Sequence, residues 1–212
     1  MTTIAAWLRW VEYLGVVAFA ASGAMKGVKK HMDPFGVVIL GLVEATGGGI
    51  LRDLLLGITP PSMFRDPTYA IIAICMAALM YIRPVRRLLT RNEKAFDLAM
   101  LLADTLGIGL FTVIGVRTTI AAYPAAGVFP MLFVGTIAAT GGGILRDVLA
   151  NELPTLFTKR IYALACLAGA AVCTFLWNVS PLWSMIAGAV TVIVIRLLAA
   201  HFRWNLPQSK DV

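Results

Sequence analysis

Long apolar segments alternate with short polar connections along this chain. Seven such segments, bounded by charged residues or proline, cover about residues 5–25, 35–57, 67–83, 96–116, 126–150, 160–178 and 182–202. A helix that crosses a bilayer needs about 20 mostly apolar residues, which most of these segments approach or exceed. The pattern predicts an all-helical integral membrane protein with seven transmembrane helices in a single membrane domain, residues 1–212.

One short motif occurs in both the second and the fifth segment. "EATGGGILRDLL" runs from Glu44 to Leu55, and "AATGGGILRDVL" runs from Ala138 to Leu149, 94 residues later. From Ala45 to Leu55, ten of the eleven positions are identical in the second copy. An identity of this length within one chain indicates an internal repeat.

The repeat is longer than the motif. Upstream, at an offset of 92 residues, the matching pairs are Leu14 and Leu106, Gly15 and Gly107, Phe19 and Phe111, Gly23 and Gly115, and Glu12 and Asp104. Segments one to three (about residues 5–83) therefore repeat as segments four to six (about 96–178), and the seventh (about 182–202) stands outside. Because three is an odd number, the second copy enters the membrane from the opposite side. Inverted repeats with glycine interruptions in matching positions point to a transport pathway at the membrane midplane.

Three consecutive glycines lie just past the middle of segments two and five. They are Gly47, Gly48 and Gly49 in the first copy and Gly141, Gly142 and Gly143 in the second. Each interior glycine costs a helix about 1 kcal/mol relative to alanine, so the triplets need a reason. One interpretation is close helix packing. The other is that both helices kink or unwind there and free carbonyl oxygens that suit a cation. The two interpretations are compatible, and both stay open.

Each motif also carries an arginine and an aspartate within an apolar segment. They are Arg52 and Asp53 in the first copy and Arg146 and Asp147 in the second. Charges at such depth are costly and usually face the bundle interior or water. The repeat supplies acidic partners, so we expect two ion pairs, Glu12 with Arg52 and Asp104 with Arg146. The alternative is that each arginine extends to the nearer membrane surface.

Three other polar side chains accompany the glycines. Glu44 precedes the first triplet by one turn and has Ala138 as its counterpart. Two roles are open for Glu44, a cation ligand and a contact within the protein. Thr46 and Thr140 are expected either to donate hydrogen bonds to backbone carbonyls or to offer hydroxyls to a permeating ion.

Composition supports a membrane protein and the charges suggest an orientation. The chain is 59% hydrophobic and 14% charged, with a mean hydropathy of +0.85 and a net charge of +7. One set of connections, with the C-terminus, holds Lys26, Lys29, Lys30, Arg83, Arg86, Arg87, Arg91, Lys94, Lys159, Arg160, Arg203 and Lys210. The opposite side holds Arg9, Arg65 and Arg117. By the positive-inside rule, the chain lies in the inner (plasma) membrane with its N-terminus outside and its C-terminus in the cytoplasm.

The basic residues do not indicate a nucleic-acid partner, because they sit at the ends of apolar segments. Lys26, Lys29 and Lys30 form a cytoplasmic cluster for which contact with anionic lipid is the functional interpretation. The sequence has no HExxH, nucleophile elbow or metal-spaced Cys/His set, so we expect neither an enzyme nor a structural metal or cofactor.

The doubled "ATGGGILRD" on the second and fifth of seven helices resembles the prokaryotic relatives of the trimeric intracellular cation (TRIC) channels, a family also named for a glycine-transporter domain. The resemblance covers about residues 5–202. It implies a homotrimer with one pore per subunit, bordered by the kinked second and fifth helices, and permeation of K⁺ and Na⁺. The glycine triplets and the Arg-Asp pairs carry over. Animal members have a Lys-Glu-Val motif on the fourth helix that is associated with phosphoinositide binding. This chain has "DTLGIG" there, so phosphoinositide regulation does not carry over.

Two functions therefore remain open. A monovalent cation channel fits the glycine-rich helices and the resemblance. A secondary transporter of a small solute such as glycine fits the inverted repeat nearly as well, because interrupted helices also build substrate sites. The arginines count against the channel unless acids neutralise them, since a bare arginine in a pore repels cations.

Overall fold

The structure is a computed structural model that describes residues 3–158, 161–202 and 204. These residues form ten α-helices: α1 (Thr3–Lys29), α2 (Pro34–Leu55), α3 (Ser62–Arg65), α4 (Thr68–Tyr81), α5 (Arg83–Thr90), α6 (Glu93–Ala122), α7 (Val128–Leu149), α8 (Thr155–Thr158), α9 (Ile161–Leu176) and α10 (Pro181–His201). Four basic residues used to infer the orientation, Lys159, Arg160, Arg203 and Lys210, lie outside the described residues.

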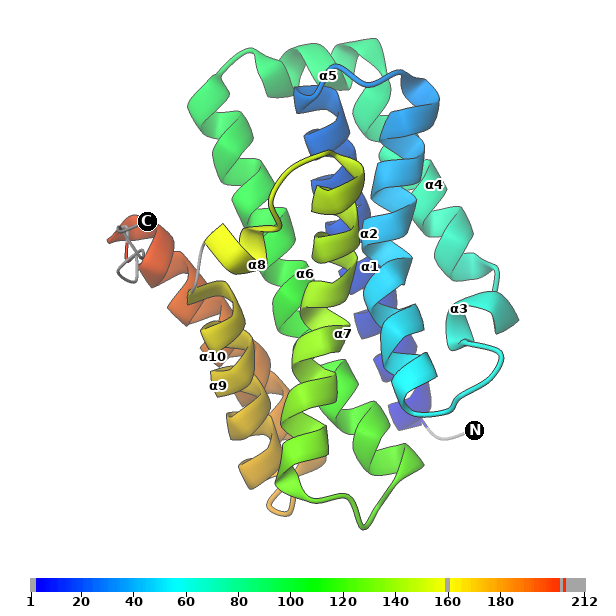
Figure 1. Cartoon of the computed structure of the whole chain (residues 1–212), viewed down its shortest axis with the longest axis vertical. Helices are drawn as coiled ribbons and strands as arrows, with labels where there is room; N and C mark the ends of the chain where they lie inside the picture. Colours follow the sequence, from blue (N-terminus) through cyan, green and yellow to red (C-terminus); the bar gives the residue numbers. More distant parts are fainter. Residues whose placement is uncertain (1–2, 159–160, 203, 205–212) are drawn as a thin grey trace, which may run out of the picture.

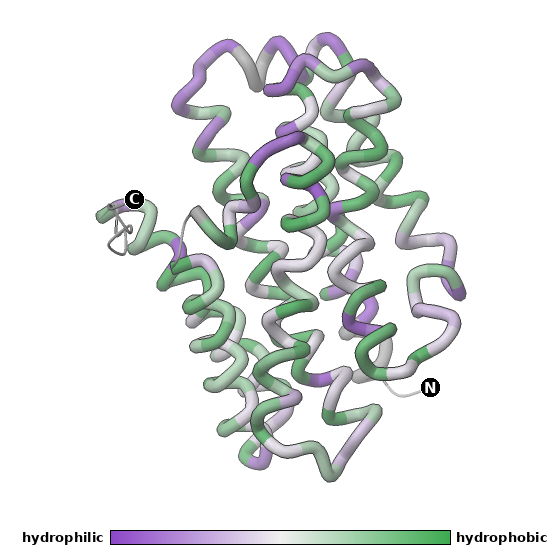
Figure 2. Tube along the Cα trace, viewed as in Figure 1, coloured by the Kyte–Doolittle hydropathy of each residue, from purple (hydrophilic) through white to green (hydrophobic). Residues whose placement is uncertain are grey.

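Each predicted apolar segment corresponds to one helix of 14 residues or more. Five of them, α1, α2, α6, α7 and α10, are long and apolar enough to cross a membrane. The other two, α4 and α9, are shorter apolar helices of 14 and 16 residues. Figure 2 shows hydrophobic positions along the helices and hydrophilic ones gathered at the end of the bundle that carries α5. The protein is therefore an all-helical membrane protein.

Equivalent helices of the two copies run in opposite directions (Figure 1). The first copy contains α1, α2 and α4, and the second contains α6, α7 and α9. At the centre, Phe19 of α1 meets its counterpart Phe111 of α6 with ring centroids 5.2 Å apart. Gly15 and Gly107 make this crossing possible, because a Cβ on either one would collide with the phenyl ring of the other helix.

The helices begin and end at recognisable caps. Asp33 accepts a hydrogen bond from the Gly36 amide at 2.7 Å, and Pro34 follows it in the first turn of α2. Both motif helices end in the same way, since Gly57 after α2 and Asn151 after α7 adopt left-handed φ values of 64° and 53°. The amides of the following residues, Ile58 and Glu152, donate hydrogen bonds to the carbonyls of Asp53 and Asp147 at 2.8 and 2.9 Å, as in a Schellman motif. The repeat thus includes the turns that follow the motif.

Candidate functional site: a glycine crossing between two ionic clusters

The two glycine triplets pack against each other where α2 crosses α7. A Cβ on Gly48 would overlap the carbonyl oxygen of Ala138, and one on Gly142 would overlap the carbonyl oxygen of Glu44. A Cβ on Gly47 would lie 3.4 Å from the Gly142 Cα. Two helix backbones can approach this closely only where both lack side chains. The structure therefore supports the packing interpretation.

Neither motif helix is unwound at its triplet. Residues Pro34–Leu55 and Val128–Leu149 are each one continuous α-helix, so their carbonyls are not released by unwinding at the triplets. Thr46 and Thr140 donate instead to carbonyls of their own helices, Leu42 and Thr136, each at 2.8 Å. The close contact with the opposite helix accounts for the glycines without an unwound turn.

The Arg-Asp pairs have the same geometry in both copies. Arg52 Nε donates to Asp53 Oδ1 at 2.7 Å, and Arg146 Nε donates to Asp147 Oδ1 at 2.8 Å. The second carboxylate oxygen of each aspartate accepts the amide hydrogen bond that starts the next short helix, from Ser62 of α3 at 2.7 Å and from Thr155 of α8 at 2.8 Å. Each aspartate therefore connects its arginine to the short helix that follows the motif helix, α3 or α8.

The upstream acids differ in their partners. Asp104 forms the predicted ion pair with Arg146, with 3.4 Å between Oδ1 and Nη1, and also accepts a hydrogen bond from the Tyr162 hydroxyl at 3.2 Å. Glu12 accepts a hydrogen bond from the equivalent tyrosine, Tyr69, but makes no ion pair with Arg52. The predicted Glu12–Arg52 pair is therefore wrong, because Arg52 turns to its neighbour Asp53.

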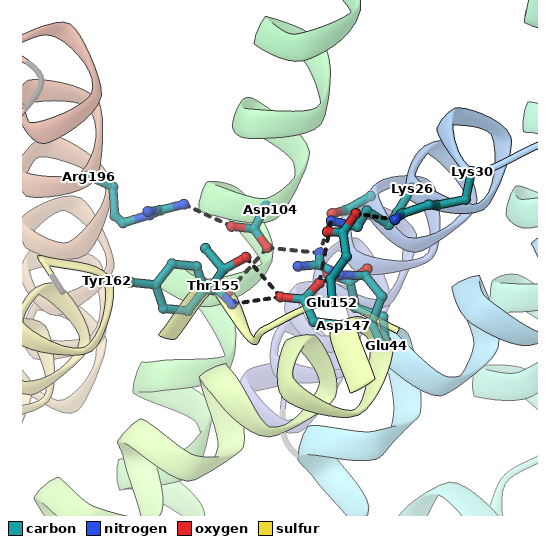
Figure 3. Close-up of polar contacts among 11 residues, drawn as sticks. Lys26, Lys30, Glu44, Asp104, Asp147, Glu152, Thr155, Tyr162 and Arg196 are labelled. Atoms are coloured by element: carbon teal, nitrogen blue, oxygen red, sulfur yellow. Dashed lines mark hydrogen bonds and ion pairs between the residues drawn. The ribbon is translucent and has the colours of Figure 1, made fainter. Parts of the chain in front are cut away.

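The Arg146 cluster joins side chains from six helices: Ser22 of α1, Glu44 of α2, Asp104 of α6, Arg146 of α7, Tyr162 of α9 and Arg196 of α10. Figure 3 draws its polar contacts. Arg146 Nη1 reaches Glu44 Oε1 at 2.6 Å and the Ser22 hydroxyl at 3.0 Å, in addition to Asp104. Glu44 is fully buried, and its Oε2 has no hydrogen-bond partner. Of the two roles left open for Glu44, the structure shows a contact within the protein.

Arg196 of α10 completes this cluster and could not be found from the repeat. Its Nη2 donates to Asp104 Oδ2 at 2.8 Å, and its guanidinium lies 4.3 Å from the centre of the Tyr162 ring. Because α10 stands outside the repeat, no matching residue in the first copy draws attention to Arg196. An arginine well inside an apolar segment was the available signal.

The Arg52 cluster, Arg52 with Asp53, is simpler because two residues are replaced. The position equivalent to Glu44 is Ala138, and the position equivalent to Ser22 is Ile114. Arg52 therefore faces no acid on the opposite motif helix, whereas Arg146 faces Glu44. The two halves share a backbone plan, but only the half near α5 has an ionic network across helices.

A cavity of about 580 Å³ reaches the Arg146 cluster. Its polar walls include Ser22, Asp104, Arg146, Tyr162 and Arg196, and Lys29 and Asp97 line it nearer the surface. Glu44 lies behind Arg146 and does not line it. The cavity thus gives water and small solutes a route to Arg146 and Asp104.

The three lysines at the end of α1 are engaged within the protein. Lys29 pairs with Asp97 of α6 at 2.7 Å, and both Lys26 and Lys30 pair with Glu152 after α7. Hydrogen bonds from these two lysines lower the pKa of the Glu152 carboxyl from its ordinary value. Lys26 is also 3.9 Å from Asp147, which links α1 to the Arg-Asp pair of α7.

Comparisons with known proteins converge on one family. A family model described as "Glycine transporter" matches residues 9–84 and 101–178. A membrane protein of Deinococcus radiodurans, named UPF0126, is 38% identical over 208 residues, covering 97% of this chain and 93% of the relative. The UPF0126 inner membrane protein YadS of Escherichia coli K12 is 36% identical over 202 residues, covering 93% of this chain and 94% of the relative.

Solved structures resemble this one over almost the whole chain. One, determined to explain conductance through TRIC cation channels, gives a TM-score of 0.84 at 34% identity and covers 96% of this chain and 98% of that chain. Another, the TRIC trimeric intracellular cation channel orthologue from Rhodobacter sphaeroides, gives 0.83 at 29% identity, with coverages of 93% and 98%. Both agree with the fold described above.

Proposed function

This chain belongs to the TRIC channel family, described also as the glycine transporter family, and on that premise we propose that it is a channel for monovalent cations, K⁺ and Na⁺. The structural observation that carries the proposal is the α2–α7 crossing with a buried ionic cluster on either side. Ionisable side chains at membrane depth are rare and mark ion or substrate paths. The proposed path runs along α2 and α7, past the glycine triplets, where we expect these helices to bend.

The arginines are compatible with cation passage because each is paired with acids. Arg52 pairs with Asp53, and Arg146 contacts Glu44, Asp104 and Asp147. A passing cation would therefore meet matched charges rather than a bare guanidinium. This pairing answers the main objection that the sequence raises against a channel.

The proposal extends to the assembly and the membrane. We propose a homotrimer with one pore per subunit, supported by the trimeric channel named among the structural relatives. We also propose that α4 and α9 cross the membrane, giving seven spans in two inverted repeats plus α10. At about 1.5 Å per residue they are short for a 30 Å core, and the preceding helices α3 and α8 supply the remaining depth.

Single-channel recording tests the function. Purified protein in planar bilayers under a KCl gradient should give discrete currents that reverse near the K⁺ potential. Leu101 lines the cavity, so a cationic thiol reagent should reduce the current of a Leu101→Cys variant. The control is the wild type, whose Cys75 is exposed on α4 and does not line the cavity, and whose current should not change.

A secondary transporter of a small solute such as glycine is the second candidate. One observation favours it: Asp104 and Arg196, a carboxylate and a guanidinium, both line the cavity and would suit the two charges of an amino acid. Silent bilayers together with saturable glycine uptake into liposomes of the same preparation would replace the channel with this transporter. Currents without such uptake would exclude it.

A further inference from the structure

The short helix α5 has a composition unlike that of the rest of the chain. From Arg83 to Arg91 the sequence "RPVRRLLTR" holds four arginines and no acid. The nearest acids are Asp66 before it and Glu93 after it. No other segment of this length carries so much charge of one sign.

The backbone sets α5 across the end of the bundle (Figure 1). Ile82 ends α4 in an extended conformation, with φ −57° and ψ 132°, and Pro84 starts the next helix within its first two residues. Asn92 then caps α6 by accepting from the Lys94 and Ala95 amides at 3.1 and 3.3 Å. Between the end of α4 and the start of α6, α5 therefore lies at the edge of the apolar part of the bundle.

Helical spacing separates the arginines from the apolar residues. Arg83, Arg86, Arg87 and Arg91 lie at positions i, i+3, i+4 and i+8, and therefore on one face. The apolar positions are Pro84, Val85, Leu88 and Leu89, which share the other face. A basic amphipathic helix of this kind lies in the plane of a membrane surface.

Three arginines of this face have no acidic partner in the described part of the chain. Among the residues that the structure describes, no ion pair joins Arg83, Arg87 or Arg91 to an acid, and all three are exposed. Arg86 places its guanidinium 5.0 Å from the centre of the Tyr81 ring, at the end of α4. By contrast, Lys26, Lys29 and Lys30 at the same end are paired with Glu152 and Asp97. Of the arginines and lysines compared here, those without an acidic partner are therefore Arg83, Arg87 and Arg91.

We propose that the arginine face of α5 binds the headgroups of anionic phospholipids in the leaflet at that end of the bundle. The charge complementarity is direct, since the negative charge of a phospholipid headgroup attracts a cluster of cationic side chains at the membrane surface. The apolar face gives a lipid, rather than a free anion, contact with the hydrocarbon boundary. The paired lysines, which the sequence alone suggested for this role, contribute less because acids of the same chain already neutralise them.

The test counts lipids and does not depend on conduction. Full-length protein in a neutral detergent would be titrated with phosphatidylglycerol and with phosphatidylcholine, and the bound lipids counted by native mass spectrometry. An Arg83→Gln/Arg87→Gln/Arg91→Gln variant removes three charges from α5. An arginine near an anionic surface contributes about fivefold in binding, so the variant should bind phosphatidylglycerol roughly a hundredfold more weakly.

The control variant removes the same charge from the other end of the molecule. Arg9→Gln/Arg65→Gln/Arg117→Gln should bind phosphatidylglycerol within about threefold of the wild type if the site is α5, since distant charges are screened. Equal losses in both triple variants would show a general charge effect and overturn the proposal. So would unchanged binding in the α5 variant, equal binding of phosphatidylcholine by the wild type, or displacement of the lipid by inorganic phosphate at the same ionic strength.

A charge-conserving variant separates binding from folding. If the glutamine variant does not fold, Arg83→Lys/Arg87→Lys/Arg91→Lys should fold and still prefer phosphatidylglycerol over phosphatidylcholine. Loss of that preference in the folded lysine variant would also overturn the proposal.

Discussion

The middle glycine of each triplet has less room than its neighbours, and this difference is not visible in the sequence. Gly48 and Gly142 face the backbone of the opposite helix, whereas Gly49 faces the flexible end of Met63, whose Cε would lie 2.8 Å from an added Cβ. Three identical residues in a row therefore have different tolerances. Backbone cannot move aside without shifting a helix, but a methionine side chain can change rotamer.

We expect Gly48→Ala to destabilise the protein by about 1–3 kcal/mol or more, because the added methyl group would separate α2 from α7. Gly49→Ala is the matched control and should be near neutral, since the better helix propensity of alanine offsets the displacement of Met63. Thermal unfolding of both variants in detergent, followed by circular dichroism, measures the difference. Equal unfolding temperatures for the two variants would contradict the backbone contact.

Asp104 and Glu12 occupy equivalent positions but should differ in their importance for stability. Asp104→Asn would remove the charge that Arg146 and Arg196 share in a buried site, which typically costs about 3–5 kcal/mol. Glu12→Gln changes only a half-buried hydrogen bond with Tyr69 and should cost about 1 kcal/mol. The yield of folded protein in size-exclusion chromatography and its unfolding temperature compare the two. A loss for Glu12→Gln as large as that for Asp104→Asn would disprove the asymmetry.

The seven apolar helices can be predicted from the hydrophobic pattern of the sequence, but the three short helices between them cannot. Seven apolar segments were expected, and each corresponds to one of these helices. The helices α3, α5 and α8, of 4, 8 and 4 residues, were not expected. Two of them begin at a side-chain contact, since Asp53 and Asp147, nine and eight residues earlier, accept the first amides of α3 and α8. Hydrophobic periodicity cannot detect elements this short.

The connection between α7 and α8 is held to α1 by Glu152, and this contact should depend on pH. The hydrogen bonds from Lys26 and Lys30 lower the pKa of Glu152 in the folded protein below the ordinary value of 4.5. A lowered folded-state pKa gives stability that is present above pH 4.5 and is lost as the pH falls through the lowered value.

Unfolding temperatures of the wild type should therefore fall as the pH is lowered below about 4.5, and those of Glu152→Gln should fall less. Asp66, whose pKa is lowered by hydrogen bonds from Thr68, contributes with the same sign and remains in both proteins. The comparison of the two acid profiles isolates Glu152. Parallel profiles would show that its pairs with the lysines add no stability.

At the scale of the whole molecule, the charged residues predict which end faces the cytoplasm. The loop at Gly127 and the start of α6 at Glu93 lie at opposite ends of the bundle (Figure 1). In a Cys75→Ala background, a membrane-impermeant maleimide added to intact cells should label Gly127→Cys and leave Glu93→Cys unlabelled until the cells are opened. The reverse pattern would invert the proposed orientation.

The membrane class, the long helices, the repeat and most of the polar residues at the centre could be predicted from the sequence. All of these are local patterns or identities along the chain, which apolar length, spacing and matching residues reveal without knowledge of contacts. The contacts of the glycines and the arginines could not be predicted in this way. Whether a glycine triplet opens or packs depends on the surface of the opposite helix. Whether an arginine also reaches acids on other helices depends on the residues around it: Arg146 reaches Glu44 and Asp104, whereas the position equivalent to Glu44 is Ala138 in the other half. Such contacts join residues far apart along the chain, and their energies depend on distance and burial, which no pattern along the chain contains.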